Sequence, residues 1–298
     1  MDNPISGPDG PGAAAPLGWS NLALRVVSAA VLAPIAVLTA YTGDWPFALF
    51  WGLAATAVLW EWITLVEGPG HKVMFSSCAA ALAVATAVAW RNRPPTEGVD
   101  WWNRPVAAVL LVGLGAFAAA IFAARGRRAW VTAGIVYAGA LMLAPMVLRA
   151  DQDYGFLAMV LLFAIVWTTD VLGYFAGRAF GGPKLWPSVS PKKTWSGAIA
   201  GALGAMIVGA VLAQFAAAAN ALALAFVSLL LSALSQLGDL FESWVKRKHG
   251  AKDASHLIPG HGGVMDRLDG FWAAALAGCL IGLLRDGFDG AARGLLVW

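Results

Sequence analysis

Long apolar runs are the feature that most constrains the fold of this chain. An α-helix needs about 20 apolar residues to cross a hydrocarbon core of ~30 Å. Nine runs approach or reach that length, at approximately residues 22–42, 46–65, 73–90, 105–124, 130–149, 156–178, 194–217, 221–245 and 268–285. Helices satisfy their own backbone groups inside lipid. We therefore expect an all-α fold, a polytopic integral membrane bundle of about nine transmembrane helices.

The composition agrees with a membrane protein. Of the 298 residues, 59% are hydrophobic and 12% are charged, whereas a soluble domain carries about 25% charged residues. Residues 1–20 are rich in Gly, Pro and Ala and predict a disordered tail. Residues 21–150 predict a first set of transmembrane helices. Residues 151–298 predict a second set, with two polar loops at 179–193 and 246–267 that carry most of the candidate functional residues.

The distribution of Lys and Arg predicts the orientation. If the N-terminus is cytoplasmic, 13 of the 20 Lys and Arg residues lie in the loops on that side and 6 lie on the other side. Positive residues favour the cytoplasmic loops. We therefore expect a protein of the cell's inner or plasma membrane whose two long polar loops both face the cytoplasm.

Two of the predicted spans carry ionisable residues along one face. Such residues are costly inside a membrane and indicate function. Helical spacing places the members of each set on one face, namely Asp170, Tyr174 and Arg178 in the first and Asp239, Ser243 and Lys246 in the second, with Glu242 beside the latter. Glu61 and Arg25 are isolated. For Glu61, a structural ion pair is as reasonable an interpretation as a role in a site.

The two polar loops are suited to phosphate. The first holds SPKKTW, in which Ser190, Lys192, Lys193 and Thr194 precede a helix and could bind phosphate oxygens. Alternatively, the two lysines anchor a helix end to anionic headgroups. The second loop joins a glycine-rich turn to charged residues, and the candidates there are Lys246, Arg247, Lys252, Asp253, His261, Gly262, Gly263, Asp266 and Arg267.

Asp239 and Asp266 form the natural pair of metal ligands. One lies near the end of a span and the other near the start of the next, so the intervening loop can bring them together. Carboxylate oxygens suit Mg²⁺, which commonly bridges substrate phosphates. No zinc-type spacing competes with this interpretation. Cys78 and Cys279 lie inside apolar runs and are expected to be buried, inert thiols.

The segment from Ser243 to Asp269 resembles the signature of the phosphatidate cytidylyltransferase family, through SWVKRK, KD, PGHGG and DRLD. The resemblance extends to Asp170, Tyr174, Gly177, Arg178 and Gly181, and to SPKKTW at 190–195. It covers the chain from about residue 165 onward, whereas the first 150 residues match only as hydrophobic spans. The family commonly has Glu after SPKKTW. Here Ser196 takes that place, which puts any role of the acidic group in doubt.

The resemblance implies an Mg²⁺-dependent nucleotidyltransferase that converts CTP and phosphatidate into CDP-diacylglycerol and pyrophosphate. It implies a homodimer in contact with membrane lipid, with no nucleic-acid partner. Asp239 and Asp266 would bind the metal. The catalytic residues would be Lys246, Lys252, Asp253, His261 and Arg267. The substrate-binding residues would be Asp170, Tyr174, Arg178, Ser190, Lys192, Lys193, Thr194, Ser243, Arg247, Gly262 and Gly263.

Other functions remain open from the residues. A CTP-dependent isoprenoid-lipid kinase, or a cytidylyltransferase acting on another phospholipid, would also need a metal and a basic loop. A transporter would suit intramembrane Asp170 and Glu61, but the sequence has no apparent inverted repeat and its charges gather on one side. A structural membrane scaffold would not need matched Asp and Lys positions.

Overall fold

The computed structural model describes residues 21–68, 71–90, 103–216, 220–258 and 262–298. Each of the nine expected spans is a helix there. The helices are α1 (Asn21–Thr42), α2 (Asp44–Glu67), α3 (Lys72–Trp90), α4 (Asn103–Phe122), α5 (Arg128–Arg149), α6 (Gly155–Phe180), α7 (Trp195–Leu212), α8 (Ala221–Lys248) and α9 (Met265–Asp286), with a short α10 (Ala291–Leu296) after them. The predicted tail, residues 1–20, lies outside the described residues.

The expectation of an all-α polytopic membrane bundle is confirmed. Among the described residues, seven helices are long and apolar enough to cross a membrane. The apolar parts of α1 and α4 found there, Ala30–Thr42 and Val106–Phe122, are shorter. One small departure lies in the first polar loop, where β1 (Lys184–Trp186) and β2 (Ser190–Thr194) pair as an antiparallel hairpin.

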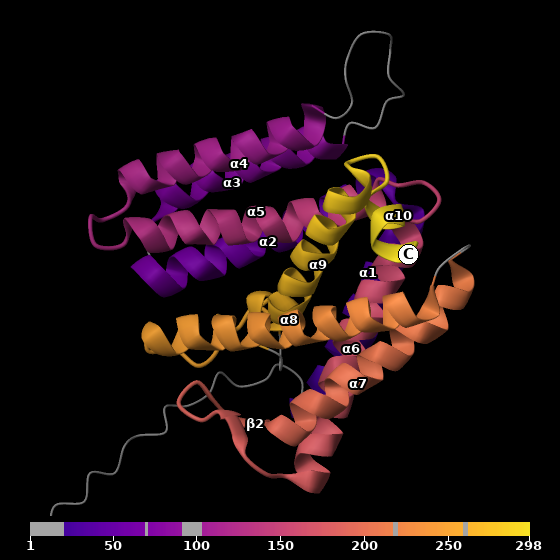
Figure 1. The fold of residues 1–298 in the computed structure, drawn as a ribbon. Coiled ribbons are helices and arrows are strands. Elements are labelled where there is room, and N and C mark those ends of the chain that lie inside the picture. Colours follow the sequence, from indigo (N-terminus) through magenta and orange to yellow (C-terminus); the bar gives the residue numbers. More distant parts are fainter. Residues whose placement is uncertain (1–20, 69–70, 91–102, 217–219, 259–261) are drawn as a thin grey trace, which may run out of the picture.

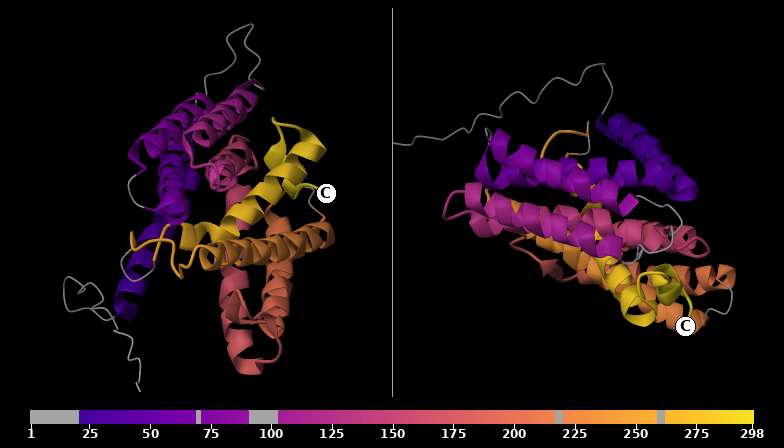
Figure 2. Two further views of the ribbon diagram at one scale, coloured as in Figure 1. Left: turned by 90° about the vertical axis from the view of Figure 1, so that its left-hand side faces the viewer. Right: turned by 90° about the horizontal axis from the view of Figure 1, so that it is seen from above.

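The helices form two groups (Figure 1). In the N-terminal group, α2 packs on α3 and α5, and α4 packs on α3 and α5. In the C-terminal group, α7 packs between α6 and α8. The purple helices of the first group and the orange helices of the second lie in different layers when the molecule is seen from above (Figure 2). Helix α9 packs on both α8 and α5 and so joins the two groups.

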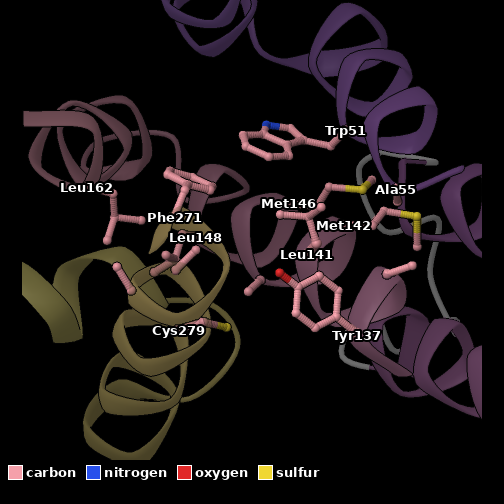
Figure 3. Close-up of a cluster of buried hydrophobic side chains, with 14 of the residues drawn as sticks. Trp51, Ala55, Tyr137, Leu141, Met142, Met146, Leu148, Leu162, Phe271 and Cys279 are labelled. Atoms are coloured by element: carbon pink, nitrogen blue, oxygen red, sulfur yellow. The ribbon is translucent and has the colours of Figure 1, made fainter. Parts of the chain in front are cut away.

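The buried core continues from one group into the other (Figure 3). The Trp51 ring of α2 stacks on the Phe271 ring of α9, with 4.8 Å between centroids. The Tyr137 ring of α5 stacks on the Trp272 ring of α9, with 4.4 Å between centroids. Cys279 is buried and unpaired, as is Cys78, in agreement with the expectation of inert thiols. The aromatic stacking holds the start of α9 against the N-terminal group.

Glycines allow the backbones of α6 and α7 to approach closely. A Cβ atom added to Gly197 would lie 2.5 Å from the carbonyl oxygen of Gly173, and one added to Gly201 would lie 2.8 Å from that of Thr169. Small residues are the usual means of close helix packing in membranes. Helix α7 begins at this seam because the Thr194 hydroxyl accepts a hydrogen bond from the Gly197 amide at 3.2 Å. The seam fixes the β-hairpin beside the end of α6.

Candidate active site

A cleft of about 450 Å³ lies where α6 ends, beside the hairpin and the start of α7. Six of the predicted site residues line it, and so does Lys184 of the hairpin. The six are Asp170, Tyr174, Arg178, Lys192, Lys193 and Thr194. A guanidinium nitrogen of Arg178 donates to the Tyr174 hydroxyl at 3.1 Å. The cleft thus brings together the ionisable face of α6 and the SPKKTW segment, which both contain candidate residues from the sequence. Gln236 of α8, which the sequence analysis did not select, also lines it.

An ion pair joins the cleft to α8. The Lys193 ammonium pairs with one carboxylate oxygen of Asp239, and the Ser243 hydroxyl donates to the other at 3.3 Å. Asp170 interacts electrostatically with Asp239, Lys193 and Arg267. The structure therefore brings together α6, the hairpin, α8 and the start of α9. Because Lys193 pairs with a carboxylate of a neighbouring helix, it is not a simple anchor to lipid headgroups.

A second charge cluster is buried between α8 and α9. The Lys246 Nζ atom lies 2.8 Å from Glu242 Oε2 and 2.5 Å from Asp266 Oδ1. Glu242 is fully buried and Lys246 is 8% exposed, so water screens this cluster little. In the sequence, Glu242 lies beside the ionisable face of α8 but is not among the residues predicted for the site. Its position four residues before Lys246 on the same helix was the available signal.

Described residues at the two ends of the second polar loop surround the carboxylate of Asp266. Its Oδ2 atom accepts hydrogen bonds from the Gly263 amide at 2.7 Å and the Ala254 amide at 3.0 Å. Gly262 has a φ of 85°, and a Cβ atom there would lie 2.8 Å from Asp266 Oδ2. This loop was expected to approach an anion, and here the anion at the Gly263 amide is a side chain of the protein.

The remaining predicted residues surround this centre. Arg247, Lys252, Asp253 and Arg267 are exposed, and Arg247 donates to the Ala251 carbonyl at 3.2 Å. Ser190 is half-buried in β2. His261 lies outside the described residues. Ser196, which replaces the acidic residue common in the family, donates to the Gly181 carbonyl at 2.5 Å and lies 3.0 Å from the Thr194 hydroxyl. It holds the start of α7 against the end of α6.

The donor set suits a hard divalent cation. Carboxylates at Asp239, Glu242 and Asp269 interact electrostatically with one another, and Asp266 interacts with Glu242 as well. Carboxylates outnumber the two lysines that pair with them. Within the described ranges, no three His, Cys, Asp or Glu side chains are already grouped as a metal site. Lys193 and Lys246 instead balance the two predicted ligands, Asp239 and Asp266. Asp269, on the same helix as Asp266, is a further candidate metal ligand.

Carboxylate–lysine ion pairs beside a cleft lined by Lys and Arg, near the ends of membrane helices, indicate a membrane enzyme that acts on charged groups such as phosphate. The chain belongs to the cytidylyltransferase family, whose pattern it matches over residues 23–282. That match begins in α1, so the likeness extends through the N-terminal helices and beyond the C-terminal half in which the motifs lie.

Several relatives are phosphatidate cytidylyltransferases by name. The one from Brucella abortus is 41% identical over 268 residues, which cover 89% of this chain and 94% of the relative. The one from Pseudomonas aeruginosa is 34% identical over 264 residues, covering 84% of this chain and 93% of the relative. The one from Haemophilus influenzae is 43% identical over 129 residues, or 42% of this chain and 45% of the relative.

Proposed function

We propose that this chain is a phosphatidate cytidylyltransferase, which makes CDP-diacylglycerol and pyrophosphate from CTP and phosphatidate. The observation that carries the proposal is the likeness, over nearly the whole chain, to relatives of that name. The site supports it independently. Its lysines and carboxylates lie at helix ends, where a lipid headgroup and a soluble nucleotide can meet.

In the proposed reaction, a phosphate oxygen of phosphatidate attacks the α-phosphorus of CTP. A new P–O bond forms, the bond from the α-phosphorus to the bridging oxygen breaks, and pyrophosphate leaves with that oxygen and its electron pair. The nucleophile is already an anion, so no strong general base is needed. The main barrier is the repulsion between two highly charged phosphates, which positioned cations reduce.

The cleft beside the hairpin is the better place for the phosphatidate headgroup. Arg178, Lys184 and Lys192 supply positive charge there. Around them stand exposed apolar side chains suited to lipid contact, at Tyr174, Phe175, Phe180, Trp186 and Trp195. A phosphate bound to these cations could keep its acyl chains in the bilayer. The membrane is therefore both the solvent of the enzyme and the source of one substrate.

The α8–α9 segment then serves the nucleotide. Lys246, Arg247, Lys252, His261 and Arg267 would offset charge on the CTP phosphates, with Asp253 and the amides of Gly262 and Gly263 shaping the loop. Asp239 and Asp266 would hold Mg²⁺, which when bound supplies positive charge to the phosphate oxygens. Lys193 and Lys246, now paired with these carboxylates, would turn toward phosphate as the substrates bind. We further propose a homodimer whose site faces the cytoplasm, as the distribution of Lys and Arg favours.

Two labels on CTP test this function against its nearest alternative. Purified protein is incubated with phosphatidate, Mg²⁺ and CTP labelled at either the α- or the γ-phosphate. A cytidylyltransferase transfers the α label to lipid and releases the γ label in pyrophosphate. A CTP-dependent lipid kinase transfers the γ label instead. EDTA should stop the reaction. If no α label enters lipid in the presence of Mg²⁺, the proposal fails.

A further inference from the structure

Glu61 is a buried carboxylate of α2 that contacts the active-site loop and has no part in the reaction described above. It is fully buried. Its Oε1 atom accepts hydrogen bonds from the Ser255 hydroxyl at 2.5 Å and the Val264 amide at 2.8 Å, and its Oε2 atom accepts one from the Met265 amide at 2.7 Å. These donors lie 194 to 204 residues away in the sequence. All belong to the segment before α9 or to its first residue.

Glu61 supplies the cap that the sequence of α9 lacks. The N-cap position is Val264, whose side chain makes no capping hydrogen bond. The first amides of a helix need acceptors from elsewhere, and a negative group at this end also interacts favourably with the helix dipole. The carboxylate from α2 meets both needs at Val264 and Met265. Gly263 permits the approach, because a Cβ atom there would lie 2.5 Å from Glu61 Oε1.

The same loop carries the backbone amides that donate hydrogen bonds to Asp266. Ala254 and Gly263, whose amides donate to Asp266, are the sequence neighbours of Ser255 and Val264, which donate to Glu61. The loop is therefore held between two carboxylates, one on α2 and one on α9 itself. A shift of the loop away from Glu61 would move the donors that orient Asp266, and with them the pairing of Asp266 with Lys246.

We propose that Glu61 is a positioning residue for the nucleotidyl transfer, which acts by fixing residues 254–255 and 263–265 and thereby the carboxylate of Asp266. The predicted effect of Glu61 on activity rests on the proposed function. The predicted effect of Glu61 on the loop does not depend on that function. The N-terminal helices thus contribute directly to the order of the active site. The negative charge matters because all three contacts are donors.

Glu61→Gln removes the charge at nearly constant volume. The NH₂ group of the glutamine cannot accept hydrogen bonds from the donors that face it. Glu67→Gln is the matched control, since Glu67 is also buried in α2 but pairs with Arg127 and His71. Hydrogen exchange of the full-length protein in detergent should be faster at residues 252–258 and 262–266 in Glu61→Gln alone, with α5 unchanged. Equal exchange in wild type and Glu61→Gln would overturn the proposal.

A second measurement separates positioning from a general loss of stability. In Glu61→Gln the Mg²⁺ concentration that gives half-maximal activity should rise by about 10-fold, the loss typical when a group behind a metal ligand is removed. The melting temperature should stay near that of Glu67→Gln. An unchanged Mg²⁺ midpoint with faster exchange would show a structural role only and would refute positioning.

Ser255→Ala covers the case in which Glu61→Gln fails to accumulate. It keeps the charge and both helix-cap contacts. It removes the hydrogen bond to Glu61 and also the one that the Ser255 hydroxyl accepts from the Leu257 amide. Exchange at residues 262–266, away from that local contact, should therefore be faster to a smaller degree than in Glu61→Gln. No change in exchange would count against the inference. If the wild-type protein transfers no α label to lipid, the proposed function is wrong. The exchange data would still show whether Glu61 holds the loop.

Discussion

The N-terminal group, α2 to α5, and the C-terminal group, α6 to α9, have similar apolar sequences but different roles. The first is mainly a scaffold, and the second carries most of the charged residues of the candidate site. Helices α3 and α4 turn large apolar residues outward, among them Val109, Leu110, Leu114 and Phe117 on α4. The C-terminal group also turns large apolar residues outward, such as Ile199, Leu203 and Ile207 of α7. In addition, it gathers carboxylates and lysines from neighbouring helices into ion pairs. The difference teaches that hydropathy alone does not separate scaffold from site. What separates them is where charged residues lie along a helix and which helix lies opposite.

Both groups contain tightly packed glycines, such as Gly134 and Gly139 of α5 in the N-terminal group, but two individual positions differ sharply. At Gly113 of α4, an added Cβ atom would meet nothing within 4 Å. At Gly197 of α7, it would lie 2.5 Å from a backbone oxygen of α6. The two groups are nevertheless linked, because Glu61 and Tyr137 reach α9 from the N-terminal side. The scaffold therefore helps to place the site, and the following variants test this division.

The largest effect is expected at the two predicted metal ligands. Asp239→Asn and Asp266→Asn should each lower the rate of CDP-lipid formation by at least ~10²-fold, since removing a group that stabilises the transition state costs that much or more. The isosteric change keeps the volume but removes the charge. Asp153→Asn, at an exposed carboxylate between the groups, should leave the rate unchanged. Near-normal turnover of either site variant would contradict the assignment.

Lys246→Met should show how much the C-terminal group depends on its buried charges. Removing one partner of a buried ion pair costs about 3–5 kcal/mol, here because Glu242 and Asp266 would face each other without a cation. The melting temperature in detergent measures the loss. Lys246→Met combined with Glu242→Gln should recover part of the stability but no activity.

The corresponding pair in the N-terminal group should matter less. Arg127 lies 3.6 Å from Glu67, and its side chain is 51% exposed. Glu67 itself is buried, but His71 lies 3.7 Å from its carboxylate and remains in Arg127→Met. Arg127→Met should therefore lower the melting temperature less than Lys246→Met does. If Arg127→Met lowers the melting temperature as much as Lys246→Met, the contrast between the two groups is wrong.

The glycine seam gives a smaller effect. Gly197→Ala should destabilise the protein by about 1–3 kcal/mol, because the added methyl group must push α6 and α7 apart. Gly113→Ala should change stability by no more than about 0.5 kcal/mol. Melting temperatures of the two variants, measured side by side, test the comparison. Equal values would mean that the seam between α6 and α7 can relax without cost.

The smallest effect is expected at the rim of the cleft. Tyr174→Phe removes the hydroxyl that accepts from Arg178 at 3.1 Å, and such a hydrogen bond contributes about 0.5–1.5 kcal/mol. The KM for phosphatidate should therefore rise by a factor of about 2–10, with kcat little changed. Tyr41→Phe, an equally exposed tyrosine of α1, should leave both constants unchanged. A fall in kcat instead would place Tyr174 nearer the reacting atoms.

The sequence by itself determined the helices and several of the residues that line the cleft. Length and hydropathy are local properties, so nine apolar runs sufficed to locate α1 to α9. Helical spacing placed Asp170, Tyr174 and Arg178 on one face, and all three line the cleft. The resemblance at Ser243 to Asp269 identified the family that the comparisons confirm. The cytoplasmic orientation, the metal and the homodimer stay predictions.

The tertiary structure decided which distant residues contact one another. The hairpin of β1 and β2 is too short for a periodic signal, and it forms where α6 and α7 meet. The pairing of Lys193 with Asp239 depends on which helices are neighbours, which sequence spacing does not encode. Glu61 was an isolated acid in the sequence, and only packing of α2 against α9 gave it three hydrogen-bond donors. Contacts between distant segments arise from packing, because a local pattern fixes the face of a helix but not what lies across from it.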